Sequence, residues 1–337
     1  MTDTTTPVID VHAHAVPSSL STAHTVGQWY GLPVARTEQQ LLRVSPAGGS
    51  ERVSPWSHAA ENVSRRLADM DATGVDIQIV SLLPSLWWFD EAVLDVAAAA
   101  RQTNDDFIAL ARQHPQRLRV FAHLPLHQPH AAVAELERVM ESEVVVGAAV
   151  PTHVNGRNWD DPELYPVLEA ADRVGALLFF HPAAVRLKND LPNYHLSNLI
   201  GNPTETTIAI ASLIFGRVLE RLPSVRMVFA HGGGYACMAI GRFDHGRRVR
   251  KENAELRELP SSYLPRLYFD SIVHSDTALR FLIDTVGADR VVLASDYPAD
   301  MGPADPVAVV RDNTLLTDQE VQAILGGNLA RLLGLEP

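Results

Sequence analysis

Eight short apolar runs recur along the chain, each bounded by polar residues, glycine or proline and separated from the next by an amphipathic stretch. The runs cover residues 8–11, 77–80, 118–121, 147–150, 177–180, 227–230, 267–269 and 291–294. They predict buried strands, and the stretches between them predict helices at about residues 59–73, 91–113, 129–141, 162–174, 204–222, 235–250, 276–286 and 317–333. Apolar strands that alternate with helices indicate a parallel sheet covered on both faces. Eight such units favour an α/β fold, a closed (β/α)8 TIM barrel forming a single domain over residues 1–337, with an open doubly wound sheet as the alternative.

A long irregular segment follows the first predicted strand, at about residues 17–57. It is rich in glycine and proline and carries the aromatic residues Trp29, Tyr30 and Trp56. Loops that follow barrel strands line the active-site face. We therefore expect this insertion to act as a lid or a pocket wall, the alternative being a loop without function.

Two helix starts carry recognisable capping patterns. Asn202 is followed by Pro203 and, three residues after Asn202, by Glu205, which is typical of a capped first turn. Thr317 with Glu320 repeats the pattern as a capping box.

Charge and composition exclude several classes of protein. The net charge of −12 disfavours nucleic acid and anionic membranes as partners. No run of eighteen apolar residues is present, and the N-terminal MTDTTTPVID lacks the basic and apolar regions of a secretory signal. Cys237 is the only cysteine, which excludes disulfides and cysteine-based zinc sites. These features predict a cytoplasmic protein.

Ionisable residues stand at the ends of four of the predicted strands. His12 and His14 end the first strand in Asp-Val-His-Ala-His, and alternate residues of a strand point to the same side. His181, His231 and Asp296 follow the fifth, sixth and eighth strands. Strand ends converge at one face of a barrel, where catalytic residues sit. So many imidazoles and a carboxylate at one point favour a bound cation, the alternative being polar residues that satisfy one another.

These motifs and their order resemble the amidohydrolase superfamily, and within it the branch of aminocarboxymuconate-semialdehyde decarboxylase and its relatives. The resemblance covers nearly the whole chain. It is carried by the motifs Asp10-Val11-His12-Ala13-His14, Asp69-Met70-Asp71 with Gly74-Val75-Asp76, Pro151-Thr152 with Asn155-Gly156, His181-Pro182, Asn202-Pro203 with Glu205-Thr206, His231-Gly232-Gly233-Gly234, Phe269-Asp270-Ser271 with His274, and Ser295-Asp296-Tyr297-Pro298.

The resemblance implies that His12, His14, His181 and Asp296 are metal ligands, with His231 beside the metal as the acid–base residue. Three nitrogen ligands and one carboxylate oxygen suit Zn²⁺, one per subunit. Related decarboxylases with a glutamate in place of His12 favour manganese, so Mn²⁺ is the alternative.

The scarcity of lysine bears on the number of metal ions. Lys188 and Lys251 are the only lysines, and neither stands at a predicted strand end. Two-metal amidohydrolases use a carbamylated lysine at the end of the fourth strand, where this chain has Val150-Pro151-Thr152. A mononuclear site is therefore expected.

Two arginines are expected to bind a substrate carboxylate. Arg242 lies eleven residues after His231, at a place from which the resembled family reaches the pocket of a neighbouring subunit, so a homodimer is expected. Arg52 is the second candidate. Guanidinium groups bind carboxylates in a bidentate manner. Solvated surface arginines are the alternative for both, and Asp270 and His274 either support the site or belong to the core.

The resemblance implies a zinc-dependent non-oxidative decarboxylase. Its substrate would be a small anionic carboxylate, an unsaturated or aromatic acid such as aminocarboxymuconate semialdehyde or a salicylate-like acid. The alternative is a metal-dependent hydrolase or hydratase that acts on a ring-cleavage product, an amide or a lactone. The metal motifs alone do not separate these functions, because both use the same ligands with His231.

Overall fold

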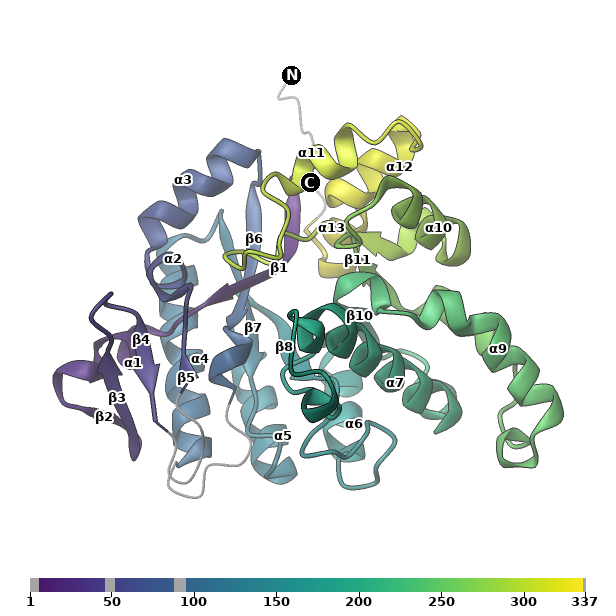
Figure 1. The fold of residues 1–337 in the computed structure, drawn as a ribbon, viewed down its shortest axis with the longest axis horizontal. Coiled ribbons are helices and arrows are strands. Elements are labelled where there is room, and N and C mark those ends of the chain that lie inside the picture. Colours follow the sequence, from purple (N-terminus) through teal and green to yellow (C-terminus); the bar gives the residue numbers. More distant parts are fainter. Residues whose placement is uncertain (1–5, 46–51, 88–94, 336–337) are drawn as a thin grey trace.

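Eight parallel strands form the centre of the molecule (Figure 1). The structure, a computed structural model, describes residues 6–45, 52–87 and 95–335. The strands pair in the order in which they follow one another along the chain. They are β1 (Ile9–Ala15), β6 (Ile77–Leu82), β7 (Leu118–His123), β8 (Val145–Pro151), β9 (Leu177–His181), β10 (Arg226–Phe229), β11 (Tyr268–Asp270) and β12 (Val291–Val292). Each coincides with a predicted strand, and the predicted (β/α)8 barrel is confirmed.

Hydrogen bonds between β1 and the segment after β12 close the barrel. The backbone N–H of His14 donates to the carbonyl of Tyr297 at 2.7 Å. The N–H of Asp296 donates to the carbonyl of His12 at 2.8 Å. Closure therefore brings Asp296 beside His12 although the two residues stand near opposite ends of the chain.

The apolar strands are buried because both of their faces are covered. Phe179 stacks on Phe121 with ring centroids 5.4 Å apart, and its ring lies 4.8 Å from that of His12. The next residue, Phe180, instead stacks on Phe229 at 4.7 Å. Successive side chains of a strand point to opposite faces. This alternation turns His181 to the same side as Phe179, towards His12.

Helices surround the strands (Figure 1). The α-helices are α1 (Ser18–Thr22), α2 (Ser57–Glu61), α3 (Val63–Thr73), α4 (Val96–Gln113), α5 (Pro129–Val139), α6 (Tyr165–Val174), α7 (Asn202–Phe215), α8 (Val218–Arg221), α9 (Ala236–Val249), α10 (Asp276–Val286), α11 (Pro306–Arg311), α12 (Asp318–Gln322) and α13 (Asn328–Leu333). Two π-helices, η4 (Ser197–Gly201) and η10 (Ala323–Gly327), precede α7 and α13. Short 3-10 helices are η1 (Ala23–Thr25), η2 (Pro84–Leu86), η3 (Lys188–Asp190), η5 (His231–Gly233), η6 (Lys251–Asn253), η7 (Pro260–Ser262), η8 (Leu264–Arg266) and η9 (Ala288–Arg290). Among the described residues, none of these helices has the length and apolarity to cross a membrane.

Some predicted helices are divided, and one predicted cap is wrong. Asn62 accepts a hydrogen bond from the N–H of Arg65 and so starts α3 separately from α2. The capping box of Thr317 and Glu320 is confirmed. Asn202, however, caps nothing, because η4 already carries the chain into α7 in helical conformation. Residues 91–94 of the predicted helix 91–113 lie outside the described residues.

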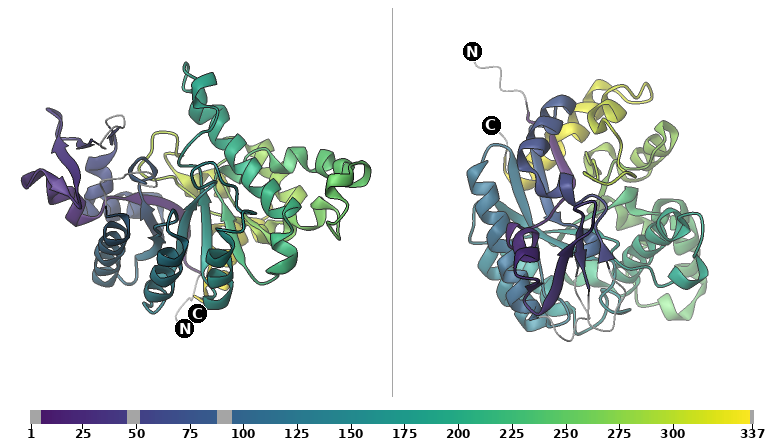
Figure 2. Two further views of the ribbon diagram at one scale, coloured as in Figure 1. Left: turned by 90° about the horizontal axis from the view of Figure 1, so that it is seen from below. Right: turned by 60° about the vertical axis from the view of Figure 1, so that its left-hand side comes forward.

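The insertion after the first strand has more regular structure than expected. It contains α1, η1 and a four-stranded antiparallel sheet of β2 (Gln28–Trp29), β3 (Leu32–Arg36), β4 (Leu42–Val44) and β5 (Arg52–Val53). This sheet lies at one end of the molecule, and α9 projects at the opposite end (Figure 2). Residues 46–51 of the insertion lie outside the described part. Its function as a lid stays a prediction.

Gly147 provides a test of how closely β8 and β9 pack. It pairs with Leu177, and a Cβ at Gly147 would overlap the Leu177 carbonyl. We expect Gly147→Ala to lower the free energy of unfolding by about 1–3 kcal/mol, the usual cost of overpacking. Thermal denaturation monitored by circular dichroism measures the effect.

Gly246→Ala in α9 is the matched control. Its Cβ would meet only the amide nitrogen of Asn253, at an ordinary 3.6 Å. Replacing a helical glycine by alanine should be neutral or stabilise by up to about 1 kcal/mol. An unchanged midpoint for Gly147→Ala would contradict the proposed tight contact.

Candidate metal centre and active site

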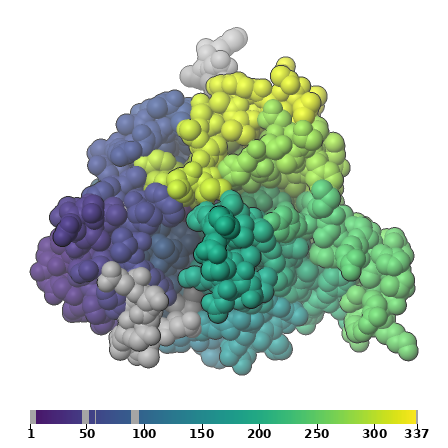
Figure 3. All heavy atoms as spheres, in the orientation of Figure 1, coloured from purple at the N-terminus to yellow at the C-terminus, as the bar shows by residue number. Residues whose placement is uncertain are grey.

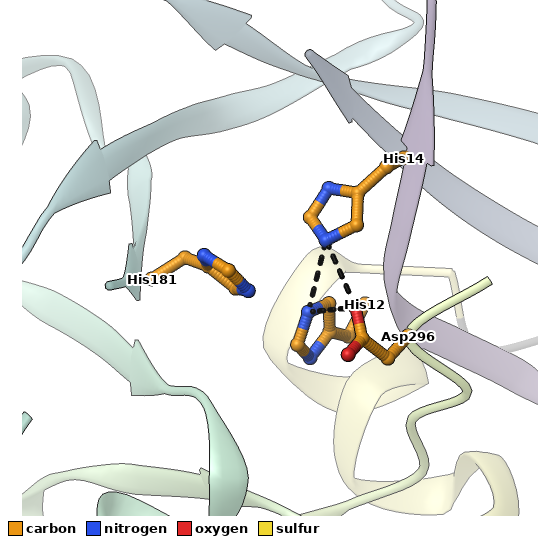
Figure 4. A group of neighbouring side chains, drawn as sticks. All are labelled: His12, His14, His181 and Asp296. Carbon is orange, nitrogen blue, oxygen red and sulfur yellow. Dashed lines mark hydrogen bonds and ion pairs between the residues drawn. The ribbon is translucent and has the colours of Figure 1, made fainter. Parts of the chain in front are cut away.

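Three histidines and one aspartate from distant segments meet at the end of the barrel. His12 and His14 lie on β1, His181 ends β9, and Asp296 follows β12. Each offers one ligand atom, and these atoms all lie within 4.8 Å of one another. All four side chains are buried, with exposed fractions of 0–7%. Figure 4 shows the rings of His12 and His14 beside Asp296, with His181 pointing at them from the other side.

Short contacts connect three members of this cluster. The Nε2 atoms of His12 and His14 are 3.2 Å apart. The Oδ1 atom of Asp296 lies 3.2 Å from Nε2 of His12 and 3.1 Å from Nε2 of His14. The three atoms thus face a common point.

His181 shows that the cluster fits a metal ion. Both of its ring nitrogens are buried and lack a hydrogen-bond partner among the described residues. An unpaired buried polar atom costs about 1–3 kcal/mol, and coordination to a cation would remove that cost for one nitrogen. Zinc bonds such nitrogen and oxygen ligands at about 2.0–2.2 Å, so the chemistry and the proximity of the four side chains fit a single ion.

The protonation states of His14, His181 and Asp296 are also those of a metal site. Burial lowers the pKa of His14 to about 4. Burial, together with the facing His12 and His14, lowers the pKa of His181 well below its usual value. Burial would raise the pKa of Asp296, but the charge of His12 and hydrogen bonds from the histidines outweigh it and hold that pKa well below its usual range. Neutral imidazoles and an ionised carboxylate are the forms that coordinate metals.

His12 behaves differently because two carboxylates face it. Burial lowers its pKa, but the charges and hydrogen bonds of Asp296 and Asp270 outweigh burial and raise the pKa to about 10. A cation that binds at the cluster therefore competes with the proton on His12.

Asp270 and Ser81 hold the outer nitrogens of two of the histidines. Nδ1 of His12 lies 2.8 Å from Oδ2 of Asp270, which is wholly buried. Nδ1 of His14 lies 3.0 Å from Oγ of Ser81. Such outer contacts fix the ring orientation and leave Nε2 free for a metal. Asp270 thus supports the site, the first of its two expected roles, whereas no sequence signal pointed to Ser81.

His231 stands beside the cluster on the segment after β10. Its Nε2 atom lies 3.7 Å from Oδ2 of Asp296. His231 and the three following glycines all have positive φ, between 55° and 75°. The N–H of Gly232 donates to Asp270 at 2.9 Å. A tight backbone turn, fixed by the same carboxylate that orients His12, therefore aims His231 at the cluster.

Three adjoining cavities lie near this cluster, and residues of the cluster line two of them. The inner cavity, about 230 Å³, is lined by His14, His181, His231 and Asp296 among others. A second, the His274 cavity, has about 300 Å³ and shares His231 and Asp296 with the first. A third, the Arg52 cavity, has about 470 Å³ and adjoins the inner cavity at Pro84, Ser85, Ala183 and Asn202.

The structure places the two predicted substrate arginines differently. Arg52 lines the Arg52 cavity and donates to the carbonyl of Trp87 at 3.1 Å. Arg242 is exposed on α9 and lines none of the three cavities. Lys188 also lines the Arg52 cavity, which sequence reasoning missed because it considered that residue only as a bridging ligand.

The remaining histidines near strand ends also have places in this arrangement. His195 lines the inner cavity, His153 the Arg52 cavity and His274 the His274 cavity. His123 is buried at the end of β7, with its ring 5.9 Å from that of Trp87.

Comparison with known proteins identifies the family. The model of the family described as "Amidohydrolase" matches residues 9–335. The chain belongs to the amidohydrolase family. This amidohydrolase is similar to the 2-amino-3-carboxymuconate-6-semialdehyde decarboxylase of Dictyostelium discoideum. The two are 33% identical, over 98% of this chain and 92% of the relative's length.

Solved structures share the fold. The apo structure of IDCase from Metarhizium anisopliae has a TM-score of 0.83, with 23% identity over 98% of each chain. A 5-carboxyvanillate decarboxylase from Novosphingobium aromaticivorans, solved with manganese and 4-hydroxy-3-methoxy-5-nitrobenzoic acid, has a TM-score of 0.78. It is 22% identical, over 98% of this chain and 96% of that one.

Asp270 tests whether its contact with His12 matters for metal binding. We expect Asp270→Asn to weaken metal affinity by about 10–100-fold, as loss of an outer-shell partner does. Competition with a chromogenic chelator measures the affinity. Asp284→Asn is the control, because Asp284 pairs with Arg280 at the surface and its side chain is 64% exposed. Equal metal affinities in Asp270→Asn and Asp284→Asn would contradict the role of Asp270 in metal binding.

Proposed function

We propose that this amidohydrolase is a metal-dependent non-oxidative decarboxylase of an unsaturated or aromatic carboxylic acid. The buried cluster of three imidazoles and one carboxylate, with His231 facing the same cavity, supports the metal dependence. Similarity over nearly the whole chain to a decarboxylase of an aminocarboxymuconate semialdehyde supports the reaction class.

We further propose one zinc ion per subunit, bound by His12, His14, His181 and Asp296. Three imidazole nitrogens and one carboxylate oxygen are a donor set typical of zinc. Manganese is the alternative, since a structural neighbour holds that ion. A cation held by these four residues would supply electrostatic stabilisation of the negative charge that develops as the carbon–carbon bond breaks.

Arg52 and His231, near the cluster, are proposed to bind the substrate and to supply a proton. Arg52 would bind a substrate carboxylate from its cavity. The bond between the substrate carbon and its carboxyl carbon breaks, CO₂ leaves, and the electron pair stays on the substrate carbon. His231 would then deliver the proton that replaces CO₂ at that carbon, because its Nε2 faces the inner cavity beside Asp296.

His231→Ala tests this division of roles. We expect the variant to retain one metal ion per chain and to lose about 10²–10⁴-fold in rate, the usual contribution of a positioned acid or base. Metal content is measured by plasma mass spectrometry. Activity is measured as CO₂ release from muconate-type and hydroxybenzoate acids. Loss of the metal would make His231 a ligand instead.

The same assay separates the decarboxylase from the alternative hydrolase or hydratase. Products formed in ¹⁸O-labelled water are analysed by mass spectrometry. Incorporation of the label into product without CO₂ release would replace the proposed reaction by hydrolysis or hydration.

We also propose that Arg242 reaches the pocket of a second subunit. Exposed apolar residues lie on α9 and on the segment between β9 and α7: Met238 is 74% exposed, Tyr194 85% and Leu199 46%. The hydroxyl of Tyr235 donates to the carbonyl of Leu199 at 3.4 Å, so η4 and α9 form a continuous surface. Exposed apolar patches mark protein interfaces. A homodimer through this surface would remove Arg242 from solvent.

Mixed dimers test the contribution of Arg242 across subunits. Arg242→Ala and His231→Ala chains, each impaired alone, are co-expressed with different tags and purified as hybrids. If Arg242 acts on the partner subunit, the hybrid regains activity, because one of its two sites has both residues. Hybrids no more active than the parents would contradict the proposal, and sedimentation velocity reports whether dimers form at all.

A further inference from the structure

The segment between β9 and α7, residues 182–201, lies across the end of the barrel where the cluster opens. It is the teal block at the centre of Figure 3. Tyr194 and His195 both have left-handed φ, 55° and 58°. Non-glycine residues rarely adopt this conformation, and two in succession are strained. The π-helix η4 follows at once, and π-helices occur frequently at functional sites.

An ion pair between Arg186 and the buried Glu205 anchors the start of this segment. Glu205 on α7 is 1% exposed and accepts hydrogen bonds from the backbone N–H of Arg186 at 2.7 Å and from its Nε at 2.9 Å. A Cβ on Gly201 would meet the side chain of Val185 at 2.5 Å. Glu205 therefore ties the start of the segment to α7, and Val185 near its start lies against Gly201 at its end.

The course of segment 182–201 places two amide side chains at the cavities beside the cluster. Asn198 on η4 and Asn202 at the start of α7 line both the inner cavity and the His274 cavity. The two cavities meet at these amides together with His231 and Asp296. Within the described part of the chain, neither amide side chain forms a hydrogen bond, so both are available to a ligand. A molecule that contacts His231 and Asp296 therefore also lies within reach of Asn198 and Asn202.

We propose that Asn198 and Asn202 determine substrate specificity by binding an uncharged hydroxyl or amino group beside the carboxylate that leaves. The inference rests on the proposed decarboxylase function. An amide both donates and accepts, so it suits a group of this kind. Asp300, which is not one of the proposed ligands, also lines the inner cavity, and its carboxylate disfavours a further anionic substituent there. The cations Arg52 and Lys188 line the adjoining Arg52 cavity, which Asn202 also lines and which would accommodate a second carboxylate.

The first test is kinetic. Asn198→Leu and Asn202→Leu keep the side-chain volume but remove the hydrogen bonds, whereas the serine variants keep a donor and an acceptor. For an acid that the wild type decarboxylates, each leucine variant should lose about tenfold in kcat/KM, through KM, as one lost hydrogen bond to substrate implies. The serine variants should recover part of that loss. Metal content should not change, because neither residue is a ligand.

Asn193→Leu is the matched control, since Asn193 is exposed on the same segment and lines none of the three cavities. Calorimetry on the metal-loaded proteins adds a readout other than turnover, with 2-nitrophenol and nitrobenzene as unreactive probes. The wild type should prefer 2-nitrophenol, and the leucine variants should lose that preference while Asn193→Leu retains it.

The outcomes distinguish a failure of the decarboxylase function from a failure of the role of Asn198 and Asn202. A wild type that releases no CO₂ from any acid overturns the proposed function. An active wild type whose leucine variants keep both kcat/KM and the preference for 2-nitrophenol overturns the role of Asn198 and Asn202. Leucine variants that lose activity with kcat alone, or with loss of metal, show a structural role and overturn it as well.

Discussion

The closure of the barrel between its first and last strands is the constraint on which the site depends. It places the carboxylate of Asp296 against the imidazoles of His12 and His14 in a buried space. An uncompensated buried charge costs several kcal/mol. The same hydrogen bonds that complete the sheet, between His14 and Tyr297 and between Asp296 and His12, also bring the compensating groups together. The same contacts therefore close the sheet and assemble the site.

A second layer of polar contacts makes this arrangement specific. Asp270 bonds to the ring of His12 and to the backbone of Gly232, so one carboxylate positions a candidate ligand and the turn that carries His231. Asp10, wholly buried, accepts from the hydroxyl of Ser295 and from the amide of Gln78. These residues connect β1, β6 and the segment after β12 below the cluster. A buried polar network with each member bonded rigidifies its surroundings.

The cavities around the cluster differ in charge, and the difference suits a polar, anionic substrate. The Arg52 cavity carries the cationic side chains of Arg52 and Lys188, while the His274 cavity has no arginine or lysine and is lined largely by apolar and amide side chains. Both adjoin the inner cavity, where His231 faces the cluster. A substrate bound across them would have its reacting carbon in the inner cavity, between the cationic side chains of one neighbouring cavity and the mainly uncharged lining of the other. Binding spread over several contacts of this kind is what orients a reactant.

The periodic pattern of the sequence alone determined the eight strands and the barrel, because strands covered on both faces must be apolar, as residues 177–180 of β9 are. It also singled out the histidines and the aspartate, because parallel strands present their ends at a common face.

Only the tertiary structure decided which groups surround them. Ser81 and Asn198 carry no local signal, since a serine after a strand and an asparagine in a loop occur throughout proteins. Asn202 had the pattern of a helix cap, yet η4 removed the helix end that it would have capped and turned its amide towards the cavity. Local sequence specifies conformation through short-range sterics and hydrogen bonds, whereas the direction of a side chain at the site depends on packing between segments far apart in the chain.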